Sequence, residues 1–311
     1  MVRVKTLAAV LLTMILAVVA VADTKAGAAK SSAPKSSASK LTAEEIAQKN
    51  VAARGGLQAW RAVQTISYSG KMEAGGNHRP VMAPSSAKRG MIVPKLETVE
   101  QVQLPFVMEF KRPRKERVEL QFNGQTVLQV FDGANGWKVR PYLNRKVVEP
   151  YTTDELKATA NQSELDGPLV DYAAKGTRIE LAGTEKVEGH DTYKLLVTPK
   201  TGAPFHLWID AETFLETKME GNPHRLDGKM HPVEIYFRDY RTVSGLVIPY
   251  VNETKVLDIT STPGVKEISE KIRIDEVKVN PKLEDALFTK PQLDAPVNAK
   301  KTPTPALAGG Q

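Results

Sequence analysis

Three of the five histidines lie close together in the sequence, beside acidic residues that could share a metal ion with them. His206, His224 and His231 fall in one segment with a further set of acids, Glu220, Asp227 and Glu234. A metal site needs ligands at spacings that bring them together, as in His-Glu-x-x-His, and often a thiolate. The chain has neither that motif nor any cysteine. We therefore predict no metal site and no cofactor.

Motifs for covalent catalysis and phosphate binding are also missing. The sequence contains no Gly-x-Ser-x-Gly elbow, and the stretch 133–138 lacks the spacing of a phosphate-binding loop. Acidic residues are numerous, but their spacing alone assigns no pair for a glycosidase. The sequence favours a protein that is not an enzyme, and an envelope hydrolase with an unrecognised carboxylate site stays an alternative.

Residues that could bind a ligand by contact are easier to find. Aromatic side chains on predicted strands could line an apolar cavity, and Arg112, within the basic run 111–117, could anchor a covering segment. The candidate cavity-wall residues are Phe106, Phe110, Phe122, Trp137, Trp208 and Tyr236. A surface role for Arg112 in that basic run is the alternative.

Helices and strands must position these residues. Thr42 and Glu45 form a capping-box pattern that starts a helix, which ends at Gly55-Gly56. Helices are predicted at 42–54, 57–63, 153–160 and 165–174. The hydrophobic period then changes to two, which is typical of strands joined by tight turns. Strands are predicted at 65–72, 99–111, 115–122, 126–131, 136–140, 177–187, 192–198, 205–210, 215–220, 232–241, 247–257 and 266–279.

Several strands carry apolar or aromatic residues on both faces. Val233, Ile235 and Phe237 alternate with Tyr236, although a sheet with one wet face would alternate apolar with polar. Either helices cover one face and fill it, or the sheet curves around an apolar cavity. Loop 73–97, which is long and rich in glycine and proline, is predicted to be a disordered insertion, with ligand gating as the alternative.

The two ends of the chain have their own composition. Residues 1–22 combine Arg3 and Lys5, an apolar run and the small-residue site Ala20-Val21-Ala22, which is typical of a cleaved signal peptide. Residues 23–40 are predicted to be a disordered linker, 41–290 one domain and 291–311 a disordered tail. Without cysteine, the exported protein is expected to have no disulfide and no lipid anchor.

The net charge of +7 lies mostly outside the predicted domain. The signal peptide contributes two of these charges, the linker three and the tail one, which leaves +1 for residues 41–290. A nearly neutral domain does not favour a nucleic acid as partner.

The order of these elements and several short motifs resemble the LolA-like superfamily of periplasmic lipoprotein carriers and their relatives. A helix precedes the first strand, and Lys111-Arg112-Pro113 ends an early strand, like the lysine-arginine-proline signature of that family. Phe131-Asp132-Gly133 with Trp137 matches an Asp-Gly followed by an aromatic, and 280–288 is similar to the closing segment.

The resemblance implies a mostly β, α+β fold: a curved antiparallel sheet that forms an incomplete, half-open β-barrel with helices covering its concave side. It implies that Arg112 holds a helical lid by hydrogen-bonding helix carbonyls. Glu116 departs from the family, which has an aromatic residue there. The implied function is a monomeric periplasmic carrier of a lipoprotein or other lipidic ligand, which transiently contacts envelope membranes or a donor or acceptor protein. A sensor or protein-interaction module on the same fold is the alternative.

Overall fold

The structure is a computed structural model that describes residues 41–74, 78–81, 95–98, 102–226, 228–258 and 268–292. The predicted signal peptide 1–22 and linker 23–40 lie outside the described residues, as does the tail 291–311 apart from its first two residues. Among the described residues, none of the helices is long and apolar enough to cross a membrane.

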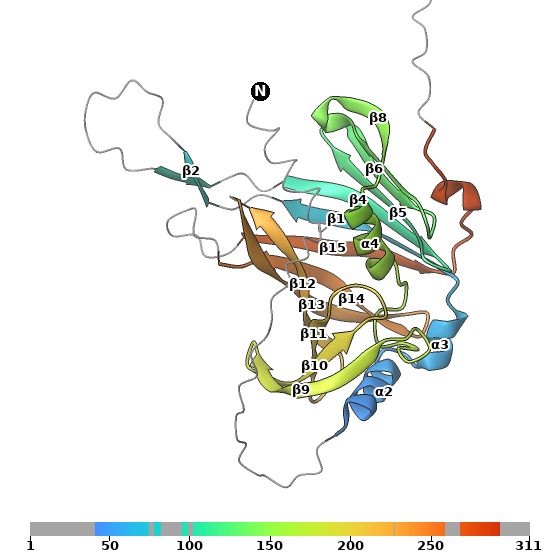
Figure 1. The fold of residues 1–311 in the computed structure, drawn as a ribbon, viewed down its shortest axis with the longest axis vertical. Helices are drawn as coiled ribbons and strands as arrows, with labels where there is room; N and C mark the ends of the chain where they lie inside the picture. Colours follow the sequence, from blue (N-terminus) through green and yellow to red (C-terminus); the bar gives the residue numbers. More distant parts are fainter. Residues whose placement is uncertain are drawn as a thin grey trace, which may run out of the picture.

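One large antiparallel sheet dominates the molecule and curves strongly (Figure 1). Its order is β8-β7-β6-β5-β4-β1-β15-β14-β13-β12-β11-β10-β9, so β8 and β9 are edges and the sheet does not close into a barrel. The predicted mostly β fold with an open, curved antiparallel sheet is confirmed. The strands are β1 (Thr65–Ala74), β4 (Val102–Lys111), β5 (Lys115–Phe122), β6 (Gln125–Phe131), β7 (Gly136–Arg140), β8 (Arg145–Pro150), β9 (Arg178–Val187), β10 (His190–Thr198), β11 (Phe205–Asp210), β12 (Glu216–Leu226), β13 (Lys229–Val243), β14 (Leu246–Val256) and β15 (Ile268–Val279).

Two features of the sheet were not predicted. Strand β8, with polar residues at its start, extends one edge by pairing with β7. The connection between β1 and β4, which includes loop 73–97, contains two short strands, β2 (His78–Val81) and β3 (Lys95–Thr98), which form a separate two-stranded sheet. The middle of the main sheet joins the two ends of the domain, because β1 pairs with β4 on one side and with β15 on the other.

Three of the four predicted helices are confirmed: α2 (Ala43–Ala53), α3 (Leu57–Ala62) and α4 (Thr153–Gln162). Capping boxes begin α2 and α4; in the first, Oε2 of Glu45 accepts from Thr42 N at 2.7 Å. At the end of α2, Gly55 adopts a φ of 107°, and a Cβ there would lie 2.2 Å from Gly245 O. Only glycine fits this position.

The predicted helix at 165–174 is wrong. Residues 163–176 form successive turns between α4 and β9. Gly167-Pro168 interrupts the pattern, because proline cannot donate to a helical carbonyl, and Asp171 has a left-handed φ of 52°. The apolar spacing that suggested a helix is still used, since Leu169 and Val170 are both buried.

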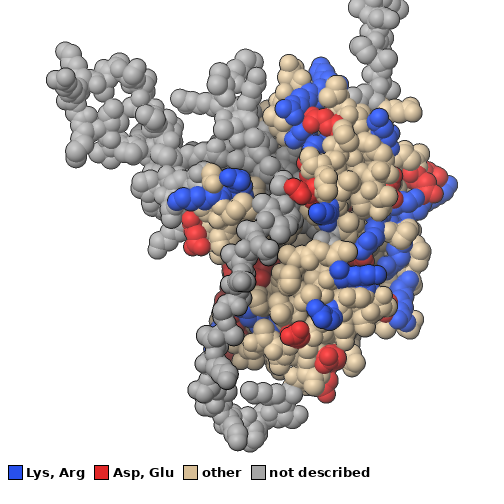
Figure 2. Space-filling model, in the orientation of Figure 1, with Lys and Arg blue, Asp and Glu red and all other residues tan. Residues whose placement is uncertain are grey.

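Two apolar cores lie on the same face of the sheet, which we call the inner face. The first core joins α3 to β1, β4, β5, β6, β14 and β15, around Trp60, Phe106 and Ile274. The second core joins α2 to β9, β10 and β11, around Ile46 and Leu207. We call the opposite side of the sheet the outer face. On the side of the molecule that Figure 2 shows, basic and acidic side chains are interspersed.

Replacing the connection between β1 and β4 tests whether loop 73–97 supports the domain. Ala74 and Val102 are direct cross-strand partners, so an Asn-Gly turn joining them should preserve the register. We expect the Tm to change by less than about 3 °C, which corresponds to roughly 1 kcal/mol for a domain of this size. A larger drop in a thermal unfolding scan would show that the loop contributes to the core.

Candidate functional site: a clamped segment over the inner face

The 163–176 segment crosses the inner face and contacts both cores. Its neighbouring residues Leu169 and Val170 are fully buried, Leu169 in the second core and Val170 in the first. Leu165 and Tyr172 pack more loosely, against the first and second core respectively. Turns of this kind have few internal hydrogen bonds, so contacts with the rest of the molecule must fix the position of the segment.

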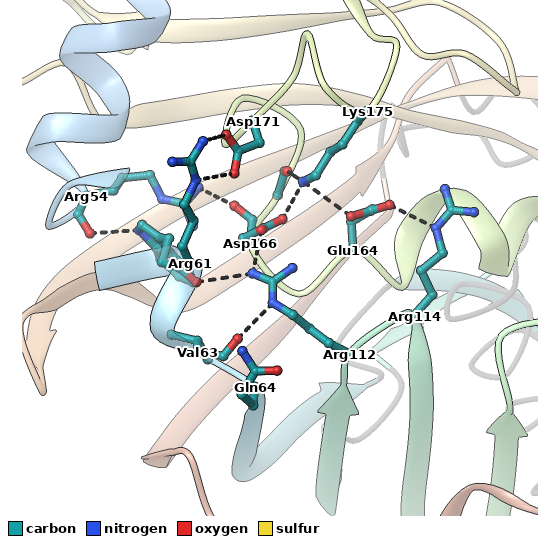
Figure 3. Close-up of polar contacts among 12 residues, drawn as sticks. Arg54, Arg61, Val63, Gln64, Arg112, Arg114, Glu164, Asp166, Asp171 and Lys175 are labelled. Atoms are coloured by element: carbon teal, nitrogen blue, oxygen red, sulfur yellow. Dashed lines mark hydrogen bonds and ion pairs between the residues drawn. The ribbon is translucent and has the colours of Figure 1, made fainter. Parts of the chain in front are cut away.

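The carboxylate of Asp166 is the centre of these contacts (Figure 3). Its side chain is only 3% exposed and accepts from Arg112 Nη2 at 2.7 Å through one oxygen. The other oxygen accepts from Lys175 Nζ. A buried carboxylate is costly unless it is paired, and here two cations compensate it.

Arg112 connects Asp166 to the end of α3. Its Nε donates to Val63 O at 2.8 Å, and its Nη2 also donates to Trp60 O at 3.1 Å. Carbonyls at the C-terminal end of a helix lack partners within the helix, and a guanidinium can satisfy several of them at once. Arg112 therefore makes the hydrogen bonds to helix carbonyls that the family resemblance implied, and Asp166 is an additional partner. Its role in ligand binding stays a prediction.

Arg54, at the end of α2, holds the same segment from beneath. Its Nη1 donates to Asp166 O at 2.9 Å and lies 3.4 Å from Glu216 Oε1. The guanidinium carbon lies 4.4 Å from the ring centroid of Trp60, whose Nε1 donates to Arg54 O at 3.0 Å. Sequence analysis missed Arg54 and Asp166, since nothing in the pattern marks a charged residue in a turn as buried.

More exposed ion pairs also hold the solvent-facing edges of the 163–176 segment in place. Arg61 makes two hydrogen bonds with Asp171, at 2.9 and 2.6 Å, and these hold the pKa of the Asp171 carboxyl below its usual value. Arg114, just after β4, donates to Glu164 at 2.9 Å. The segment is thus held by apolar contacts underneath and by charged contacts along its edges, an arrangement that suits a movable cover over an apolar surface.

The six aromatic candidates divide between the two faces. Phe106 and Phe122 belong to the first core and Phe110 packs against it, so these three lie on the inner face. The other three candidate cavity-wall residues, Trp137, Trp208 and Tyr236, do not lie on this face. In their strands they alternate with the inner-face residues Lys138, Leu207 and Ile235, and they lie on the outer face. Alternation predicted two apolar faces but not which one is enclosed.

The outer-face aromatics have charged neighbours. Trp208 lies between Lys194 and Lys218, whose Nζ atoms are 4.8 and 4.0 Å from its ring centroid. Tyr236, the cross-strand partner of Lys218, donates its hydroxyl hydrogen to Glu234 at 2.6 Å. Cations over aromatic rings cover this apolar surface without a core.

The histidines do not meet at one point. Nδ1 of His206 lies 2.9 Å from the carboxylate of Glu220. His224 and His231 are cross-strand partners in the hairpin of β12 and β13. Within the part of the chain that the structure describes, no group of three or more His, Cys, Asp or Glu side chains is arranged to hold a metal ion.

Glu116 lies on the inner face, although it is an acid. It is the cross-strand partner of Phe110 on one side and of Phe131 on the other. Burial raises the pKa of its carboxyl from the usual 4.5 to about 7. Its Oε2 atom is buried and has no hydrogen-bond partner among the described residues.

No family model matches the sequence, and no curated protein does either. Solved structures show similarity over most of the domain. A LolA superfamily protein from Nitrosomonas europaea has 14% identity and a TM-score of 0.47, with 81% of this chain and 99% of that chain covered. A domain described as an outer membrane lipoprotein-sorting protein, from Vibrio parahaemolyticus, also has 14% identity and a TM-score of 0.47, with 80% and 96% covered.

A DUF1329 family protein from Desulfovibrio piger has 15% identity and a TM-score of 0.48, with 79% of this chain and 97% of that chain covered. One of these three structures is described as a LolA superfamily protein, the group that the sequence motifs resemble.

Removing the Arg112 side chain should loosen the segment. In Arg112→Leu, Asp166 keeps only Lys175 as side-chain partner, Val63 O loses its side-chain donor, and Trp60 O keeps only the backbone N–H of Val63. We expect amide hydrogen exchange in 163–176 to become at least about tenfold faster, with the fold retained. Arg225→Leu, an exposed arginine of the β12–β13 hairpin, is the control. Unchanged protection of 163–176 in Arg112→Leu would remove Arg112 from the clamp.

The raised pKa of Glu116 predicts that this carboxyl lowers the stability of the fold as the pH rises. Between the unfolded value of 4.5 and the folded value of about 7, the native state binds a proton that the unfolded chain releases. Glu116 therefore leaves the stability of the fold unchanged below about pH 4.5. As the pH rises from there to about 7, Glu116 lowers the free energy of unfolding progressively. The free energy of unfolding of Glu116→Gln, relative to that of the wild type, should therefore increase by up to about 3 kcal/mol from about pH 5 to pH 8. This corresponds to about 1.4 kcal/mol per pKa unit.

Denaturant unfolding of both proteins at the two pH values measures this difference. Glu119→Gln, on the outer face of the same strand beside Arg117, should follow the wild type. Parallel pH profiles for Glu116→Gln and the wild type would contradict the assignment of a buried, protonated carboxyl.

Proposed function

We propose that this protein is an exported, non-enzymatic carrier of the bacterial envelope that binds the acyl chains of a lipid or lipid-modified protein on its inner face. The binding surface is the apolar area beneath the 163–176 segment. The observation that carries the proposal is the burial of the neighbouring residues Leu169 and Val170 in two different cores. Moving this one segment would expose both apolar surfaces together.

An acyl chain is a chemically reasonable replacement for those side chains. Each buried methylene contributes about 0.8 kcal/mol, so a long chain offsets the loss of two aliphatic contacts and still binds favourably. No covalent step is required, because apolar burial and its reversal account for loading and release.

The contacts at the edge of the segment suit reversible opening. The Arg61–Asp171 and Arg114–Glu164 pairs are partly exposed, with the arginines 50% and 45% exposed, and such pairs contribute only about 0–1 kcal/mol each. The more buried Asp166 provides the specific closed position. A cover held in this way can close again once the ligand has left.

Locking the segment tests the proposal directly. Since the chain has no cysteine, Arg114→Cys with Glu164→Cys introduces the only two thiols, at positions whose native side chains meet at 2.9 Å. A short, reductively cleavable bis-maleimide would join them. We expect the cross-linked protein to lose binding of a fluorescent fatty acid, and cleavage of the linker to restore it.

The matched control joins Lys186→Cys to Asp191→Cys, an exposed pair on β9 and β10 whose native side chains meet at 2.9 Å. Cross-linking there should leave binding unchanged. If the locked Arg114/Glu164 protein binds the fatty acid as well as the unlocked one, the ligand does not enter beneath the segment. If neither form binds acyl chains, the carrier proposal fails and the search turns to protein partners.

A further inference from the structure

On the inner face, the neighbouring strands β5 and β6 carry one hydrogen-bond acceptor and one donor that have no partner within the described fold. Oε2 of Glu116 on β5 and Nε2 of Gln129 on β6 are both buried and have no hydrogen-bond partner among the described residues. Gln129 is only 4% exposed. Buried polar atoms of this kind cost stability, so their retention calls for a function.

Strand register places the two groups side by side. Glu116 pairs with Phe131, and Gln129 lies two residues before Phe131 on the same strand, so Glu116 and Gln129 are diagonal neighbours on one face. The next pairs along the strands, Val118 with Gln129 and Leu120 with Val127, continue that face into the first core. The donor and acceptor therefore border the apolar surface that the proposed function assigns to the acyl chain.

The charged groups nearby are already neutralised. Lys138, the cross-strand partner of Gln129, forms a buried ion pair with Glu155 of α4. Arg140 on β7 forms an ion pair with Glu149 on the edge strand β8. Burial alone accounts for the raised pKa of Glu116, with no cation acting on it. The site thus offers a carboxyl and a carboxamide between paired charges on one side and the first apolar core on the other.

This composition selects among ligand head groups. Oε2 is an acceptor both in the carboxylate and as the carbonyl oxygen of the protonated acid. With Oε2 in that role, a phosphate or carboxylate could accept from Gln129 but would face the acceptor atom of Glu116, while an ammonium group could donate to Glu116 but not accept from Gln129. An ester carbonyl would satisfy only the donor. A secondary amide or a hydroxyl satisfies both atoms, because it carries a donor and an acceptor together.

We propose that Glu116 and Gln129 form a recognition site for a neutral head group with both a donor and an acceptor, an amide or a hydroxyl, attached to the bound acyl chain. This inference rests on the proposed function, since it assumes that the chain lies on the inner face. Glu116 Oε2 accepts from the N–H or O–H, and Gln129 Nε2 donates to the carbonyl or hydroxyl oxygen.

Tyr151 and α4 lie next to this site and connect it in sequence to the 163–176 segment. The ring of Tyr151 lies directly over Gly136, where even a Cβ would come within 2.0 Å of it, and Tyr151 leads into α4. α4 in turn leads into the 163–176 segment. A ligand would reach the polar pair when Tyr151 and α4 move with that segment.

Probes that share one chain and differ only in head group test the proposal. Competition against a bound fluorescent fatty acid gives the affinity of N-methylhexadecanamide, hexadecanol, methyl hexadecanoate, hexadecanoate and hexadecylammonium. For the wild type, we expect the amide and the alcohol to bind about tenfold more tightly than the ester, which corresponds to one additional satisfied hydrogen bond.

Variants assign the preference to the two residues. Glu116→Met and Gln129→Met, which keep side-chain length, should each reduce the preference for amide over ester to about twofold or less. Glu119→Met, on the outer face of the same strand, should keep it. The wild-type preference is measured independently of the variants, so a variant that fails to fold does not decide the test.

The outcomes separate this inference from the proposed function. If every probe fails to bind the wild type, the carrier proposal itself is wrong. If the probes bind with equal affinity, the carrier proposal stands and the polar recognition site does not. Tightest binding of hexadecanoate or of the ammonium probe would overturn the neutral head group.

Discussion

The structure depends on how the carboxylate of Asp166 is compensated. A carboxylate that is only 3% exposed requires cations, and Arg112 and Lys175 supply them from an early strand end and from the same segment. The same guanidinium also donates to Trp60 O and Val63 O at the end of α3. Arg54 adds a bond to the carbonyl of Asp166 and stacks on Trp60. One buried charge thus fixes α2, α3, the end of β4 and the 163–176 segment relative to one another.

The 163–176 segment packs against both apolar cores. Leu169 and Val170 are neighbours in sequence, yet they pack in different cores, and Val51 of α2 also contacts both. An open sheet has no closure to hold its halves at a set curvature, so side chains inserted between the cores take that role. The position of the segment and the curvature of the sheet are therefore coupled.

Sequence reasoning predicted what depends on local pattern. Period-two alternation located the strands from β4 to β15 except β8, most of them to within a few residues, and the Thr42–Glu45 capping box located α2. It failed where distant parts decide: Gly167-Pro168 turned an amphipathic stretch into turns, and alternation could not tell that Trp208 faces outward while Leu207 faces inward. Arg112 came from a family motif, whereas its partner Asp166 has no local signal, because burial of an acid in a turn is a tertiary property.

The order of the strands also limits when this sheet can become continuous. Strands β4 to β8 and strands β9 to β14 are meanders of sequential hairpins, whose contacts are local and close early. The two meanders are joined by β1, from the beginning of the domain, and β15, from its end, through a pairing such as Ile66 with Val279. During synthesis from the N-terminus, the seam between the halves stays open until β15 emerges, and its pairing is complete only with Val279. The topology therefore makes assembly of the complete sheet a late event for this chain, whatever the stability of each half.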